Sequence, residues 1–200
     1  MEKKYKLTEE TKEWCGRTLH RIEALKDFSD VKAGDKGGWI EKEENLSQDG
    51  SAWVYDEARV SGSAWVDGSA RVSGSAWVTG SARVSGEARV SGSARVYGEA
   101  RVSGEARVSG EARVSGEARV SGEARVSGNA DYIVFKNWWS SGRYFTWTRS
   151  NNMWKVGCFY GTGEELIKKA YADSEKSGRE YERIVKYVES ILADEKEKEE

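Results

Sequence analysis

Apolar residues recur every six positions through the middle of the chain. An alanine stands at every sixth residue from Ala52 to Ala130, and a valine follows each of the first thirteen alanines by two positions. In every unit after the first, a glycine follows the valine by two positions, so the unit reads A-R-V-S-G-E. Side chains alternate along an extended segment, so the alanine and the valine share one face. The pattern predicts a short strand in each unit, with a turn at the glycine.

A period of six also predicts how these strands are arranged. Three short sides joined by turns close a triangle, and stacked coils of this kind pair their backbone groups about 4.8 Å apart. We therefore expect a mainly β fold, a triangular parallel β-solenoid with 18-residue coils over residues 51–130. An N-terminal β cap and a C-terminal α+β domain would flank it.

The spacing of Val60 and Ala64, repeated along the chain, resembles the hexapeptide-repeat proteins. That resemblance implies a left-handed parallel β-helix, although the glycine here follows the aliphatic position by two residues rather than one. The chain is also similar to phage and prophage hexapeptide-repeat proteins of poorly defined function. The segments that carry this similarity are TLHRIEAL, DVKAGDKGGWIE, NLS, AWVYDEARV, DYIVF, RYFTWTR and VGCFYGTGEE. It implies a viral or mobile-element setting and brings no reaction with it.

The flanks lack the repeat and are expected to form the two caps. Residues 1–50 would form an N-terminal cap and an irregular first coil, with a strand at Thr18–Leu25. Residues 131–192 would form a three-stranded meander and two helices, because strand-like runs are followed by two capping-box pairs. The runs are 132–136, 143–149 and 153–160, and the pairs are Thr162 with Glu165 and Ser177 with Glu180. Residues 193–200 read as a charged, disordered tail.

The outward position between alanine and valine is arginine in ten units and tryptophan in the other three, Trp53, Trp65 and Trp77. With three sides per coil, every third of these residues stacks in one column, and the three tryptophans fall on three different sides. Residues 51–130 hold ten arginines and nine acids. One interpretation is a solvated ladder in which the repeat glutamates neutralise the arginines. The alternative is a column that binds phosphates or carboxylates, since arginine does so bidentately.

Aromatic residues outside the core are the candidates for contact with a partner. Trp138 and Trp139 lie at an expected turn and are the first choice, since two adjacent rings there are difficult to bury together. Arg143, Trp147 and Arg149 share one face of the expected second strand. Trp53, Tyr55, Trp65 and Trp77 complete the set of candidates. For each ring the alternative is ordinary packing in the core or in a cap.

Composition narrows the class of function. The net charge is −2, proline is absent, and no apolar run is long enough to span a membrane, so we expect a cytoplasmic protein. Cys15 and Cys158 are expected to be free thiols, the second of them buried. The one histidine, His20, precedes the repeat, and the repeat carries no inserted loop. These features argue against the acyltransferases and zinc enzymes of hexapeptide-repeat folds.

We therefore expect a chain that is not an enzyme and has no cofactor or metal. The favoured hypothesis is a binding protein whose rigid solenoid presents the C-terminal module to a host protein or complex, as a phage-encoded inhibitor of a bacterial defence system. The alternative is a structural or self-assembling virion component, and a homo-oligomer remains open. Nucleic acid is a weakly indicated partner, and an acyltransferase is the third possibility.

Overall fold

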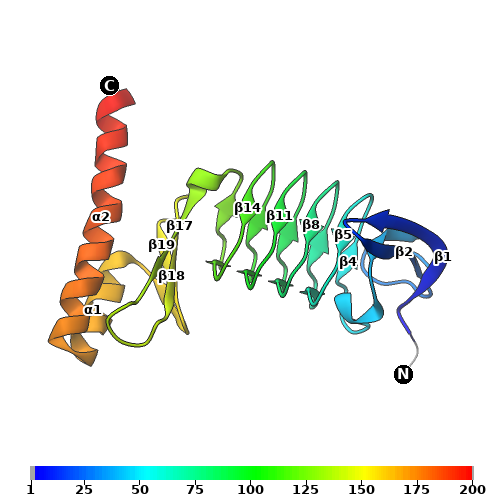
Figure 1. Cartoon of the computed structure of the whole chain (residues 1–200), viewed down its shortest axis with the longest axis horizontal. Helices are drawn as coiled ribbons and strands as arrows, with labels where there is room; N and C mark the ends of the chain where they lie inside the picture. The colour runs from blue at the N-terminus through cyan, green and yellow to red at the C-terminus, as the bar shows by residue number, and fades with distance from the viewer. Residues whose placement is uncertain (1–2, 200) are drawn as a thin grey trace.

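The computed structural model describes residues 3–199 and places a β-solenoid between two caps (Figure 1). The solenoid consists of thirteen two-residue strands that begin every six residues. They are β4 (Trp53–Val54), β5 (Arg59–Val60), β6 (Trp65–Val66), β7 (Arg71–Val72), β8 (Trp77–Val78), β9 (Arg83–Val84), β10 (Arg89–Val90), β11 (Arg95–Val96), β12 (Arg101–Val102), β13 (Arg107–Val108), β14 (Arg113–Val114), β15 (Arg119–Val120) and β16 (Arg125–Val126).

These strands form three parallel sheets, one for each side of the triangle. We call them the β4 face (β4, β7, β10, β13, β16), the β5 face (β5, β8, β11, β14) and the β6 face (β6, β9, β12, β15). Paired residues are 18 apart in sequence, as in Val90 opposite Val108. The valines of all thirteen strands, and the alanine before each strand, are at most 1% exposed. The predicted coil length and the inward pair of each unit are confirmed.

Glycine at the corner is required by both backbone conformation and space. Gly104 has φ +69°, in the left-handed region that a Cβ disfavours. A Cβ built on Gly104 would lie 3.0 Å from the backbone N of Gly122 in the next coil. Corner glycines of successive coils therefore stack directly on each other.

The N-terminal cap extends the β5 face. It consists of β1 (Tyr5–Trp14), β2 (Arg17–Ala24), β3 (Lys36–Ile40) and the short 3-10 helix η1 (Glu43–Asn45). β1 and β2 form an antiparallel hairpin, β2 pairs with β3, and β3 pairs in parallel with β5. The ladder of the solenoid therefore continues into the cap. The strand expected at Thr18–Leu25 is β2, whereas β1 was not predicted.

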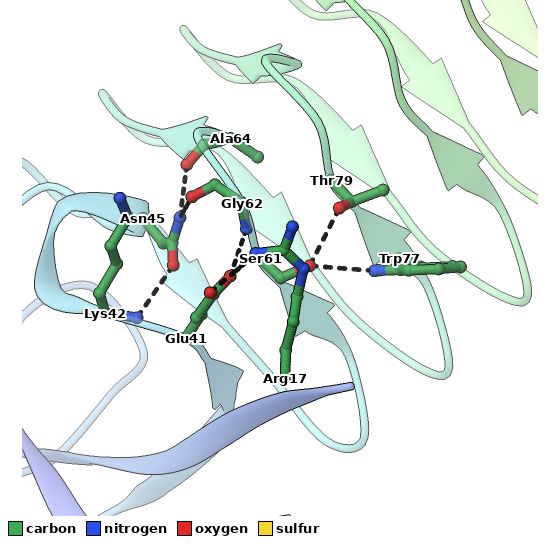
Figure 2. A network of polar contacts seen from close by, with 9 residues as sticks. All are labelled: Arg17, Glu41, Lys42, Asn45, Ser61, Gly62, Ala64, Trp77 and Thr79. Carbon is green, nitrogen blue, oxygen red and sulfur yellow. Dashed lines mark hydrogen bonds and ion pairs between the residues drawn. The ribbon is translucent and has the colours of Figure 1, made fainter. Parts of the chain in front are cut away.

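Side-chain donors satisfy carbonyl groups at the N-terminal end of the ladder. The Asn45 amide nitrogen donates to the carbonyls of Gly62 (3.1 Å) and Ala64 (2.8 Å), as Figure 2 shows. On the β4 face, the buried Lys4 ammonium lies 2.9 Å from the carbonyl oxygen of Ala52. Burial lowers the pKa of Lys4 to about 8. Without these donors the first coil would hold buried, unpaired carbonyls.

A polar network fastens the β1–β2 hairpin to the first coils (Figure 2). Arg17 forms an ion pair with Glu41 at 2.8 Å, and Glu41 in turn accepts a hydrogen bond from the backbone N of Gly62. Next to Gly62, the Ser61 hydroxyl lies 3.0 Å from that of Thr79 in the next coil. The hairpin is thus tied to the solenoid by charge as well as by pairing of strands.

The C-terminal module contains one strand more than predicted. It comprises η2 (Asn129–Asp131), β17 (Tyr132–Lys136), β18 (Tyr144–Thr148), β19 (Met153–Val156) and β20 (Phe159–Gly161), followed by helices α1 (Gly163–Asp173) and α2 (Glu175–Glu199). The four strands form an antiparallel sheet in the order of the chain. The expected third strand is split by a turn at Gly157, which has φ +57°. A three-stranded meander was therefore wrong.

α1 begins where predicted, whereas both the start and the end of α2 differ from prediction. Thr162 and Glu165 form the predicted capping box of α1. α2 starts earlier than expected, because the hydroxyl of Ser174, rather than Ser177, accepts a hydrogen bond from the backbone N of Ser177 (3.1 Å). α2 then continues to Glu199, so the expected disordered tail is helical over its described part. Glu200 lies outside the described residues.

Three side-chain oxygens from the C-terminal module terminate the ladder, one on each face. In earlier coils the backbone N of each repeat arginine donates to an alanine carbonyl of the next coil, as from Arg107 to Ala124 (2.8 Å). No coil follows the last one, so no alanine carbonyl is available to its arginine N–H groups. Its arginine N–H groups donate instead to Asn129 Oδ1 on the β5 face (3.0 Å), Thr146 Oγ1 on the β6 face (2.8 Å) and Ser150 Oγ on the β4 face (2.7 Å). The module thus fits the solenoid in one rotational setting.

None of the helices within residues 3–199 is long and apolar enough to cross a membrane.

Candidate functional site: a basic groove beside the C-terminal module

A groove of about 500 Å³ runs along the β6 face from Trp65 to the turn between β19 and β20. Its floor is the outward surface of the four strands of this face, and its far wall belongs to the C-terminal module. The residues that line it are Trp65, Asp67, Arg83, Ser85, Arg101, Ser103, Arg119, Ser121, Lys155, Gly157 and Cys158. Asp67 is the one acid among four bases, so the groove is basic.

Three arginines on consecutive strands form the axis of the groove. Arg83, Arg101 and Arg119 are paired positions of β9, β12 and β15. Their backbones are therefore separated by the inter-strand spacing of about 4.8 Å. The hydroxyls of Ser103 and Ser121, which lie beside the column, are 3.2 Å apart. The groove therefore presents a row of donors along one line.

The arginines of this column are not neutralised by the repeat glutamates. Among residues 3–197, whose side chains the structure describes, Arg71 with Asp30 (3.0 Å) is the sole ion pair that involves an arginine of the solenoid strands. The reason is geometric, because each repeat glutamate lies in the corner turn while the arginine lies on the strand. Direct ion pairs between the groove arginines and the repeat glutamates are therefore not formed among the described residues, and the side chains of Arg83 and Arg101 are exposed.

Trp65 closes the N-terminal end of the groove. Its side chain is 43% exposed, and the guanidinium carbon of Arg83 lies 6.0 Å from its ring centroid. On the opposite side, Trp65 lines a separate pocket with Glu43 and Glu44. The ring thus separates an acidic pocket from the basic groove.

The hydrogen bond between Arg119 and Thr146 holds the C-terminal wall of the groove beside the arginine column. Lys155 on β19 pairs with Thr146 on β18, and the Thr146 hydroxyl accepts the hydrogen bond from the backbone N of Arg119. This link places Lys155, Gly157 and Cys158 beside the last arginine. Cys158 is an exposed free thiol, so the prediction of a buried thiol was wrong. Cys15 is also free and exposed.

Two of the predicted partner-binding residues are core residues. Trp53 is 1% exposed and packs edge-on against Tyr5 and Phe28 of the N-terminal cap. Trp147 is 1% exposed, and its indole nitrogen donates to Asn152 Oδ1 (2.8 Å). Trp53 is buried because the N-terminal cap covers the outer surface of β4, and Trp147 is buried in the core of the C-terminal module. Neither ring can contact a partner in the folded chain.

Three more of these residues are engaged within the chain. Tyr55 is half-buried, and its hydroxyl donates to Asp30 Oδ1 (3.0 Å). Trp77 is half-buried beneath Trp14, with ring centroids 6.1 Å apart. Arg149 forms an ion pair with Glu195 at 2.7 Å.

The adjacent residues Trp138 and Trp139 differ in their exposure to solvent. Trp138 is 80% exposed, whereas Trp139 is half-buried against Phe145 and Tyr181. Arg143 is exposed and lines a second cavity of about 440 Å³, on the other side of the Gly157–Cys158 turn. The candidates that remain available to a partner are thus Trp65, Trp138 and Arg143.

The groove brings together residues that are far apart in the sequence and were not predicted to form one site. The arginine column was expected from the period, but its junction with Lys155 and Cys158 was not. The missing information was the rotational setting of the module, which depends on Asn129, Thr146 and Ser150. These three residues have no distinctive spacing, so no sequence signal identified them.

Comparison with known proteins supports the repeat architecture. Residues 82–98 and 94–110 match a family described as the YdcK beta solenoid repeat. The chain is also 37% identical over 67 residues to a protein of Escherichia coli (strain K12) named "Uncharacterized acetyltransferase YdcK". The match covers 30% of this chain and 21% of that protein, so the chain spans about a fifth of the length of this curated relative.

The name of this relative contradicts the expectation that the chain is not an enzyme. That expectation rested on the single histidine and on the regular repeat without an inserted loop. In the structure, His20 lies on β2, and its Nδ1 is 3.3 Å from the carbonyl oxygen of Thr8. It is not among the residues that line the groove.

Proposed function

We propose that this chain is a binding protein whose rigid β-solenoid presents the basic groove to an anionic group of a partner macromolecule. The observation that carries the proposal is the column of Arg83, Arg101 and Arg119, whose guanidinium groups form no ion pair with the described side chains of residues 3–197. Lys155 adds a fourth positive charge at the end of the column. Four positive charges gathered in one groove attract an anionic ligand more strongly than the same charges scattered over the surface would.

The architecture favours binding because the site is preorganised. Each arginine of the column stands on a strand that is paired on both sides or capped by the module, so little backbone order has to be gained on binding. Arginine also recognises carboxylate and phosphate groups with two parallel hydrogen bonds. A partner that carries several such groups would therefore fit this groove.

The resemblance to phage and prophage repeat proteins supports a host protein or complex as the partner. In that setting the chain would act in the host cytoplasm, as an inhibitor of a bacterial defence system. A self-assembling structural component is supported less well, because side chains and strands of the two caps cover both ends of the ladder. Coil ends that are covered in this way do not template a further coil.

The test is a pull-down from bacterial lysate with a matched pair of variants. Arg101→Glu reverses a charge in the groove, and Arg107→Glu makes the same change one side further along the same coil. We expect a stoichiometric partner to be retained by the wild-type chain and by Arg107→Glu, and to be lost with Arg101→Glu. Equal retention by both variants would place the interaction elsewhere. Light scattering on the purified chain would detect large assemblies, which would favour the structural role.

Acetyl transfer is a second candidate function, favoured by the name of the Escherichia coli relative. A phosphorylated acyl donor would place its phosphates on the same arginines. Release of free thiol from acetyl-coenzyme A, measured with a set of amine acceptors, tests this role. The activity should fall with Arg101→Glu and persist with Arg107→Glu.

A further inference from the structure

We infer that the groove on the β6 face is a nucleotide site, with an aromatic base at Trp65 and a di- or triphosphate along Arg101 and Arg119. This inference rests on the proposed function only in taking the groove as the binding site. It adds a ligand class, which is a nucleoside with at least two phosphates.

The Trp65 end has the features of a base-binding site. Trp65 is 43% exposed and lines the groove, and the Arg83 guanidinium lies over part of its ring. Bases stack on aromatic rings, and a base on the exposed part of the Trp65 ring would lie beside the Arg83 guanidinium. Asp67 lies two residues after Trp65 and lines the same groove. Its carboxylate can accept a hydrogen bond from an exocyclic amino group of the base.

The other end has the features of a phosphate site. Arg101 and Arg119 are adjacent in the column, and Lys155 lies at its end. Beside them, the hydroxyls of Ser103 and Ser121 can donate to phosphate oxygens. No carboxylate lines this half of the groove, since Asp67 lies at the Trp65 end. Successive phosphates would therefore meet successive cations.

The length and direction of the groove agree with this ligand. Trp65 and Arg119 are three strands apart, which is about 14 Å at the usual strand spacing. The cavity of about 500 Å³ lies within the range of small-molecule sites, roughly 300–1,000 Å³. Glu43 and Glu44 lie behind Trp65, so phosphates are repelled from that end and drawn toward the module.

Neither of the other two faces has an exposed tryptophan at the end of its arginine column, although on the β5 face Trp77, Arg95 and Arg113 line a smaller cavity of about 190 Å³. On the β4 face, Trp53 is buried and Arg71 is paired with Asp30. On the β5 face, Trp77 is half-buried under Trp14 of the hairpin. Within residues 3–199, an exposed tryptophan at the base of an unpaired arginine column occurs on the β6 face alone. The other faces therefore provide internal controls.

Isothermal titration calorimetry with ADP, inorganic pyrophosphate and adenosine tests the inference on the full chain. We expect ADP to bind the wild-type chain at least tenfold more tightly than pyrophosphate does. Trp65→Ala should remove that advantage and leave pyrophosphate binding unchanged. Arg101→Gln should weaken both ligands at least tenfold, whereas Arg107→Gln on the β4 face should change neither by more than twofold.

The outcomes separate this inference from the proposed function. If pyrophosphate binds in an Arg101-dependent manner but ADP binds no more tightly, the nucleotide assignment is overturned and the anionic groove stands. If Arg107→Gln weakens ADP as much as Arg101→Gln does, binding is a general effect of positive charge and the site is overturned. If neither ADP nor pyrophosphate binds, the nucleotide assignment also fails, while the pull-down with Arg101→Glu still tests the partner protein.

Discussion

Individual polar side chains decide where the solenoid begins and ends. At its start, Lys4 and Asn45 supply donors to carbonyl groups, and at its end, Asn129, Thr146 and Ser150 supply acceptors to N–H groups. A buried backbone group without a partner costs free energy comparable to a lost hydrogen bond. These five residues therefore contribute more to the fold than their small number suggests.

Replacement of Thr146 tests this role. Thr146→Val keeps the shape of a side chain that is 1% exposed and leaves the backbone N–H of Arg119 without an acceptor. We expect the free energy of unfolding to fall by about 1–3 kcal/mol. Urea denaturation measures this change, and amide hydrogen exchange should accelerate at Arg119. Thr146→Ser, which retains the hydroxyl, should recover most of the loss, and equal losses in both variants would contradict the role of the hydrogen bond.

At the scale of elements, each hexad is a strand of two residues and a corner, and the corner limits what the sequence can vary. Gly104 adopts a left-handed conformation against the backbone of Gly122. Gly128, the last glycine of the same repeated position, differs, since its φ is −140° and a Cβ there would meet nothing within 4 Å. One repeated residue therefore has two different environments.

A pair of glycine substitutions follows from this difference. Gly104→Ala should lower the free energy of unfolding by about 1–3 kcal/mol, since a Cβ in the left-handed region costs about 1–2 kcal/mol and the close contact adds to it. Gly128→Ala should change it by less than about 0.5 kcal/mol. Thermal or urea unfolding of both variants gives the comparison, and similar effects at the two sites would refute the argument from conformation.

Elements with a repeated or alternating pattern were predictable, and elements defined by tertiary contacts were not. The inward Ala and Val of each hexad determine the coil, because a period of six has one simple structural solution. β1 was missed because Tyr5–Trp14 is mainly charged and polar and is stabilised by its pairing with β2. The turn at Gly157 was missed because a glycine within an apolar run does not by itself end a strand.

The candidate site shows the same division. The columns of arginine and tryptophan followed from counting residues, and their assignment to faces is confirmed by the pairing of Trp65 with Arg83. Counting residues could not predict which rings are exposed, because residues of the N-terminal cap cover Trp53 and Trp77. Trp147 is covered by its own module.

At the scale of the whole molecule, the number of hexads determines which face of the solenoid the C-terminal module adjoins. Deletion of residues 105–122 removes one complete coil, so the module still meets the face that carries Trp65. Deletion of residues 105–110 removes one side, so the module turns by a third of a revolution toward the β5 face. Both variants keep the same inward pattern, and we expect both to fold with similar thermal stability.

The two deletions change the groove in different ways. The chain without 105–110 places Arg125 on the β6 face in the position of Arg119, so its column still holds three arginines, and it loses Lys155 and the turn at Gly157. We expect it to bind pyrophosphate several-fold more weakly than the full chain. The chain without 105–122 loses Arg119 and keeps Lys155 beside Arg83 and Arg101, so we expect weaker binding here as well. Calorimetry measures the affinities and circular dichroism checks the fold. Equal affinities of the full chain and the chain without 105–110 would show that the module does not contribute to the groove.

The identical hexads also have a consequence for how such a chain changes over generations. Tandem repeats gain and lose whole units, and the smallest step that keeps the pattern of this chain in phase is six residues. A step of six or twelve separates Trp65 from the module's lysine, whereas a step of 18 restores them to one side. Among descendants of this chain that keep the groove, the number of residues between the tryptophan and the module should therefore differ by multiples of 18.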